Sequence, residues 1–158
     1  MSAASIIAVV AVSGCGGGSN KPALTREAFV ARANPICASA AQQIKAGASS
    51  VFPDPQQAAA QNPDRVNTYA SNVVLPALRM ERDQLRALAP VTDPAYPSLM
   101  NELQKGIDRW AADKTIMAAE TDTSFSQFDA VATDLGLATC AGTDRMVRII
   151  TGGSFAVR

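Results

Sequence analysis

The sequence predicts an all-α fold, an antiparallel up-down four-helix bundle with one disulfide that joins helix 1 to the end of helix 4. Three observations support this prediction. Apolar residues recur every three or four positions in four segments, whereas the period-2 alternation of strands is absent except at residues 146–150. Short connections between the segments favour antiparallel neighbours. The chain of 158 residues has room for one ordinary domain.

The first helix is expected over residues 25–46. Thr25 can cap its N-terminus, and Glu27 lies in the first turn, where the helix dipole favours an acidic side chain. Pro35 should kink this helix or remove one hydrogen bond. Residues 47–64 are rich in Gly, Ser and Pro, which predicts a loop. The apolar face of the helix comprises Phe29, Ala33, Ile36, Cys37, Ala40 and Ile44.

The second helix is expected over residues 64–89, with Asp64 as its cap. Pro76 should kink this helix or begin a new one, and Pro90 should end it. The expected buried face comprises Val66, Tyr69, Ala70, Val73, Ala77, Met80, Leu85 and Leu88.

The third and fourth helices follow after short polar connections. Thr92 or Asp93 is expected to cap the third, with Pro94 in its first turn. The fourth should begin near Phe125 and end near Gly136. The apolar positions are Leu99, Leu103, Gly106, Ile107, Trp110, Lys114 and Met117 in the third helix, and Phe128, Val131, Ala132 and Leu135 in the fourth.

Cys37 and Cys140 form an even pair once Cys15 is set aside, and one disulfide between them is expected. The bundle topology is compatible with this pairing. At 1.5 Å per residue, residues 125–140 rise about 23 Å and residues 37–50 about 20 Å, so the two cysteines reach similar heights. A redox pair and two free thiols remain alternatives, although redox pairs usually have Cys-x-x-Cys spacing, which is absent.

The N-terminus resembles a lipoprotein signal. Residues 1–20 carry no charge, and the apolar run at residues 3–12 spans about 15 Å as a helix, half of a hydrocarbon core of about 30 Å. It is therefore too short for a transmembrane helix and fits the apolar region of a signal peptide. The lack of Lys or Arg before this run is compatible with a start codon upstream. The run ends in Val-Ser-Gly-Cys at residues 12–15, which resembles the lipobox of bacterial lipoproteins.

This lipobox implies cleavage before Cys15 and attachment of acyl chains such as palmitate to it, and two or more such chains anchor a protein stably. The alternative is a cysteine buried in a Gly-rich loop. The expected organisation is a signal peptide (1–14), a lipidated cysteine with a flexible tether (15–24), a helical domain (25–142) and a tail (143–158) whose structure the sequence leaves open.

Three stretches of the domain are similar to small actinobacterial-type cell-envelope lipoproteins without assigned activity. Residues 25–37 read Thr-Arg-Glu-Ala-Phe and then Ala-Asn-Pro-Ile-Cys, residues 85–90 read Leu-Arg-Ala-Leu-Ala-Pro, and residues 135–140 run from Leu-Gly-Leu to cysteine. The resemblance implies a disulfide-stapled helical domain on the outer face of a membrane. Val91 departs from the pattern, where such sequences often repeat proline, and so do the 18 residues that follow Cys140.

No recognisable catalytic or metal-binding set is present. The chain has no histidine, which excludes Ser-His-Asp and Cys-His systems and the Glu-x-x-His pairs of bundle metal centres. We therefore expect no catalytic residues, no cofactor and no metal. Trp110 is expected to be core rather than a platform for ligand stacking, and a spacing of five does not align Asp108 with Asp113 on a helix. The remaining carboxylates, expected on solvated faces, are Glu27, Glu81, Glu102 and Glu120.

The expected function is that of a non-enzymatic binding or structural module, anchored by lipid to the extracytoplasmic face of the cell membrane. Its partner could be an envelope protein, a cell-wall component or a lipid. Fourteen basic residues balance fourteen acidic ones, which argues against a nucleic-acid partner. One alternative is a carrier of a small apolar or lipid ligand in the bundle core, which needs a cavity of several hundred Å3. An enzyme that uses carboxylates is the least favoured alternative.

Overall fold

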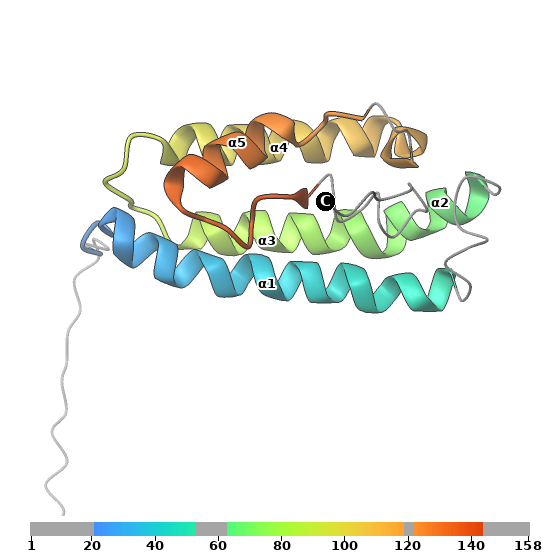
Figure 1. Cartoon of the computed structure of the whole chain (residues 1–158), viewed down its shortest axis with the longest axis horizontal. Coiled ribbons are helices and arrows are strands. Elements are labelled where there is room, and N and C mark those ends of the chain that lie inside the picture. Colours follow the sequence, from blue (N-terminus) through green and yellow to red (C-terminus); the bar gives the residue numbers. More distant parts are fainter. Residues whose placement is uncertain (1–20, 53–62, 119–121, 144–158) are drawn as a thin grey trace, which may run out of the picture.

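The computed structural model describes residues 21–52, 63–118 and 122–143, and within these ranges the regular structure is helical (Figure 1). The all-α prediction is therefore confirmed. Helix α1 packs against α3, α3 against α4, and α4 against α5. The elements are α1 (Arg26–Val51), α2 (Pro63–Tyr69), the π-helix η3 (Ala70–Val74), α3 (Leu75–Ala87), α4 (Tyr96–Ala112), the 3-10 helix η4 (Lys114–Ala118) and α5 (Ser126–Leu135).

Helix α1 begins as predicted but runs further. The Thr25 hydroxyl oxygen accepts a hydrogen bond from the Ala28 backbone N–H at 3.3 Å, which confirms the cap. The helix passes through Pro35 and ends at Val51, so the prediction that it stops before Gly47 is wrong. A Cβ at Gly47 would lie 2.4 Å from Val73 Cγ1. This glycine therefore allows a close approach between two helical segments rather than ending one.

The predicted second helix is one unbroken helical run that contains a π-helical turn, η3, between α2 and α3. The Leu75 N–H donates to the Ala70 carbonyl, five residues back, immediately before Pro76 in the first turn of α3. Proline lacks an N–H and clashes with the carbonyl four residues earlier, so a widened turn at this point accommodates it. The run begins at Pro63, one residue before the predicted cap Asp64.

The buried face of α3 includes Ala77 and Leu85, as predicted, but it contains Glu81 where Met80 was expected. Met80 is 40% exposed, whereas Glu81 is only 4% exposed and lies between the buried residues Leu78 and Leu85. The predictions that Met80 packs in the core and that Glu81 lies on a solvated face are therefore wrong. Glu81 follows Leu78 by three residues and precedes Leu85 by four, and this spacing places it on the core side of the helix.

Helix α4 begins at Tyr96, later than predicted. Asp93 Oδ1 accepts from the Ala95 N–H at 2.8 Å, so Asp93 stabilises the turn that leads into the helix, and Ala95 occupies the cap position. The predicted apolar stripe is confirmed within α4, since Leu99, Leu103, Ile107 and Trp110 are all buried. The helix ends at Ala112, however, so the prediction that it continues through Lys114 and Met117 is wrong, and these residues lie in η4.

Helix α5 begins at Ser126 and ends at a glycine, as predicted. Gly136 has φ 85°, in the left-handed region that favours glycine at helix ends. Cys140 lies in the turns that follow, so the disulfide connects α1 to the segment after α5 rather than to the helix itself. No helix among the described residues is both long and apolar enough to cross a membrane.

Gly106 of α4 lies under the ring of Phe125, and replacing it with alanine should destabilise the fold. The new Cβ would lie 2.5 Å from Phe125 Cε1, and that ring is fully buried. Overpacking of this kind costs about 1–3 kcal/mol, which exceeds the helix-propensity gain of about 1 kcal/mol. We expect urea unfolding of Gly106→Ala to show a lower midpoint. A midpoint equal to or above that of the wild type would contradict the close packing.

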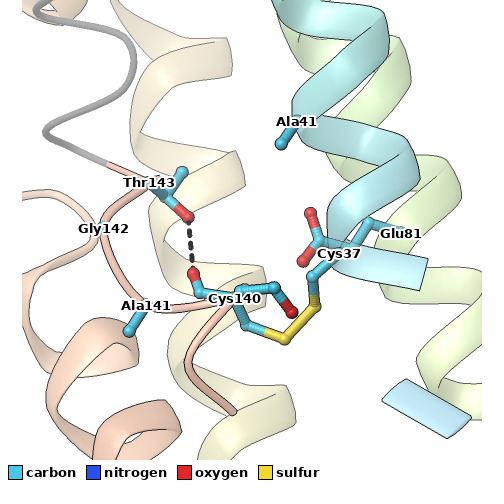
Figure 2. A pocket seen from close by; sticks show the side chains of 8 residues that line it. Cys37, Ala41, Glu81, Cys140, Ala141, Gly142 and Thr143 are labelled. Atoms are coloured by element: carbon cyan, nitrogen blue, oxygen red, sulfur yellow. Dashed lines mark hydrogen bonds between the residues drawn. A yellow bond between two sulfur atoms is a disulfide. The ribbon is translucent and has the colours of Figure 1, made fainter. Parts of the chain in front are cut away.

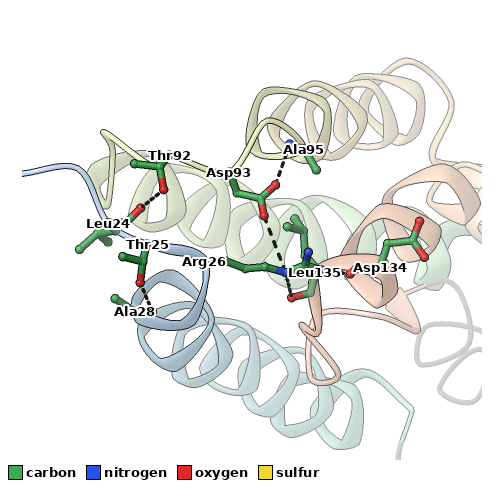
Figure 3. Close-up of polar contacts among 9 residues, drawn as sticks. All are labelled: Leu24, Thr25, Arg26, Ala28, Thr92, Asp93, Ala95, Asp134 and Leu135. Carbon is green, nitrogen blue, oxygen red and sulfur yellow. Dashed lines mark hydrogen bonds and ion pairs between the residues drawn. The ribbon is translucent and has the colours of Figure 1, made fainter.

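The chain enters the helical domain through a set of polar contacts at one end of the molecule (Figure 3). The Leu24 N–H donates to the Pro90 carbonyl, and the Thr92 N–H donates to the Leu24 carbonyl, both at 2.9 Å. The Arg26 guanidinium donates to the carbonyls of Asp134 and Leu135 at the end of α5. A cation at this position donates hydrogen bonds to the carbonyls that a helix leaves unpaired at its C-terminus, and it interacts favourably with the helix dipole. The start of the domain is thereby tied to the α3–α4 connection and to α5.

Several predictions lie outside the described residues: the signal peptide, Cys15 and most of the tether, Glu120, residues 146–150 and the tail from residue 144 onward.

Candidate functional site

The predicted disulfide between Cys37 and Cys140 is present. The two Cα atoms lie 5.0 Å apart, within the usual range for a disulfide, and the bond closes a sequence separation of 103 residues. Both cysteines are buried. The alternative of two free thiols is therefore wrong.

The side chain of Glu81 reaches from α3 toward this disulfide. One carboxylate oxygen and the two sulfur atoms all lie within 4.8 Å of one another. Figure 2 shows the carboxyl group directed into the space between α1 and the segment that carries Cys140. The fold therefore brings together one acidic side chain and two sulfurs that are far apart in the sequence.

The Glu81 carboxyl group is buried without a polar partner among the residues that the structure describes, because none of them donates a hydrogen bond to it or forms an ion pair with it. Desolvation by burial raises its pKa from 4.5 to about 8, and the negative charge of Asp129 adds to this rise. The carboxyl group is therefore mostly protonated at pH 7. Buried polar groups normally have a hydrogen-bond partner, so this one requires an explanation.

A small cavity of about 90 Å3 lies beside Glu81. The disulfide and Ala41 of α1 form one part of its lining, and residues 139–143 form another (Figure 2). Two hydrogen bonds hold Thr143 there. Its hydroxyl donates to the Cys140 carbonyl at 3.2 Å, and its N–H donates to Asp129 Oδ1 at 3.2 Å. The cavity therefore has a defined wall of mixed polar and apolar character.

The other candidate carboxylates do not join this site. Glu27 is exposed, and Glu102 accepts from Lys105 Nζ at 2.7 Å. Asp108 and Asp113 are also exposed. Among the described residues, the fold groups none of these four with Glu81 into a set of three metal-ligating side chains.

Glu81 and the two cysteines could together suggest a metal site, but their chemical state does not fit one. The sulfurs are bonded to each other, and zinc binds cysteine as thiolate. With the disulfide formed, the cluster offers one carboxyl group and two weakly accepting sulfurs.

Trp110 belongs to the core, as predicted. It is almost fully buried, and its Nε1–H donates to Asp122 Oδ2 at 2.7 Å. Asp122 Oδ1 also accepts from the N–H and hydroxyl of Ser124, which fixes the turn before α5. The indole is therefore committed to internal contacts, and the interpretation as a ligand-stacking platform is wrong.

Sequence reasoning missed Glu81 as a site residue, although one signal was available. Glu81 lies three residues after Leu78 and four before Leu85, on the same helix face. With Met80 in the predicted apolar face, the adjacent glutamate falls outside that face.

The chain matches no family model, no curated protein and no solved structure.

Proposed function

We propose that this protein is an extracytoplasmic lipoprotein whose helical domain is a non-enzymatic binding or structural module of the cell envelope. The observation that supports this best is the Cys37–Cys140 disulfide. Structural disulfides persist in oxidising compartments and are rare in the cytosol. The disulfide also uses two of the three cysteines and leaves Cys15, the residue in the lipobox-like sequence, for another role.

The entry of the chain into the domain is compatible with a tether. Leu24 is held to the connection between α3 and α4, and Lys21 Nζ donates to the Ala87 carbonyl at 2.9 Å. A lipid anchor at Cys15 would therefore hold the domain by this end. We further propose that the helices form an antiparallel up-down four-helix bundle in which α2, η3 and α3 together make the second helix.

Replacing Cys15 with alanine tests the anchor. We expect the wild-type protein in the membrane fraction, with a mature N-terminus at Cys15 that carries acyl groups. The Cys15→Ala variant should be released from the membrane or remain as an uncleaved precursor, because the acylated atom is gone. Membrane fractionation and mass spectrometry of the N-terminal peptide measure both outcomes.

Ser19→Ala is the matched control, since it alters the same region beyond the lipobox and should leave membrane association unchanged. Equal membrane association of Cys15→Ala and wild type, together with an unmodified Cys15 in the wild type, would refute the anchor.

A further inference from the structure

The cavity beside Glu81 combines three features that occur together in a binding site. It has room for a small group, it contains a buried carboxyl group without a described hydrogen-bond partner, and its wall is held by hydrogen bonds. A cavity of about 150 Å3 holds benzene, so about 90 Å3 leaves room for roughly three or four heavy atoms. We propose that this cavity is a binding site for a primary alkylammonium group.

The charges around the cavity favour a cation. Glu81 supplies a carboxyl group directly, and Asp129 on α5 adds a second negative charge close enough to affect it. Among the residues that the structure describes, those that line the cavity include no basic side chain. A bound cation would supply the charge partner that a buried carboxylate needs.

The hydrogen-bonding groups favour an ammonium group over a metal ion. An ammonium group has three donors and no acceptor. Glu81 offers carboxylate oxygens, and the Thr143 hydroxyl, whose proton points at the Cys140 carbonyl, keeps lone pairs that can accept. Hard metal ions need six or more oxygen ligands, which this lining does not supply. The methyl group of Ala41 and the disulfide provide apolar contact for one or two carbon atoms (Figure 2).

Ethylammonium chloride is the first probe, titrated into the full chain in an amine-free phosphate buffer with sodium chloride as the ionic control. A ligand of this size binds with an affinity on the order of millimolar at best. The readout is the 13C shift of the Glu81 carboxyl carbon, assigned by its loss in Glu81→Gln, together with the dependence of the melting temperature on ligand concentration.

We expect saturable binding that strengthens by up to tenfold per pH unit from pH 6 to pH 8. The reason is that an ammonium ion pairs with the carboxylate, and Glu81, with its pKa of about 8, must release one proton on binding. Glu81→Gln should weaken binding by at least tenfold. Ala41→Leu should do the same by filling the cavity while leaving the carboxyl group in place. Glu102→Gln is the matched control, because it removes a carboxylate elsewhere, and it should bind as the wild type does.

A lysine side chain carries the same ammonium group, so Nα-acetyl-lysine amide is the second probe. If ethylammonium alone binds, the ligand of the site is a free small amine. If both probes bind, the site also accepts the lysine side chain of a larger ligand. Absence of saturable binding by either probe would overturn the proposal, as would unchanged affinity in Glu81→Gln. These results are independent of the lipid anchor, since Cys15→Ala tests the anchor and leaves the cavity intact.

Discussion

Replacing Cys37 with serine is expected to lower the free energy of unfolding by about 2–5 kcal/mol. The disulfide joins residues 103 positions apart, and the chain-entropy model assigns about 4.7 kcal/mol to a closed loop of about 100 residues. The loop that this disulfide closes contains almost the whole helical domain, so loss of the disulfide should affect every helix. Urea unfolding monitored by circular dichroism measures the change.

The double variant Cys37→Ala/Cys140→Ala controls for the unpaired thiol that the single variant leaves. Adding a reductant to the wild type should reproduce the destabilisation, and the same reductant should leave the double variant unchanged. If reductant does not lower the unfolding midpoint of the wild type, the disulfide contributes little to the free energy of unfolding. If both thiols are free in non-reduced protein by mass spectrometry, the bond itself is absent.

Glu81 is expected to make the stability of this protein fall as the pH rises from about 4.5 to about 8. Its pKa is near 4.5 in the unfolded chain and about 8 in the folded protein, because burial disfavours the charged form. Between these values the folded state holds a proton that the unfolded state has lost, so each increase in pH favours unfolding. At 1.36 kcal/mol per pKa unit, the total effect is on the order of 5 kcal/mol.

Glu81→Gln removes the titrating group and should flatten the pH dependence between these limits. The measurement is the difference in unfolding free energy between variant and wild type at pH 5, 6, 7 and 8, which cancels the contributions of other carboxylates. Glu102→Gln, which changes a carboxylate that pairs with Lys105 near the surface, should retain the slope of the wild type. Parallel profiles for Glu81→Gln and wild type would show that Glu81 does not titrate in this range.

A second variant separates burial from hydrogen bonding. Glu81→Met has a similar volume and no charge, and at pH 8 it should be more stable than the wild type because it removes a buried ionisable group without a described polar partner. A less stable Glu81→Met at pH 8 would show that the carboxyl group makes favourable interactions there.

Local signals in the sequence were sufficient to predict where α1 begins and where α5 ends. Thr25 caps α1, and Gly136 ends α5 in the left-handed conformation. Both depend on interactions within a few residues, which a linear sequence contains. The periodicity of α4 also predicted its buried face, because its four large apolar residues lie on one face.

Other features depended on contacts between distant segments. Gly47 suggests a helix end from the sequence, but it lies inside α1, at a point where Val73 leaves no room for a Cβ. Met80 and Glu81 are adjacent, and the apolar one is exposed while the acidic one is buried. Helix periodicity admits either position next to Ala77 and Leu78, so only the packing of α3 against α1 and α4 decides between them.

From the sequence alone it follows that this protein is helical, that a disulfide between Cys37 and Cys140 is the favoured pairing, and that no histidine-based chemistry is available to it. These conclusions follow from composition, cysteine number and local periodicity. The position of Glu81 beside that disulfide, in a small cavity, became evident from the folded arrangement of the helices. The site is assembled from α1, α3 and the segment after α5, and these segments come together only through helix packing and the closure of a long loop.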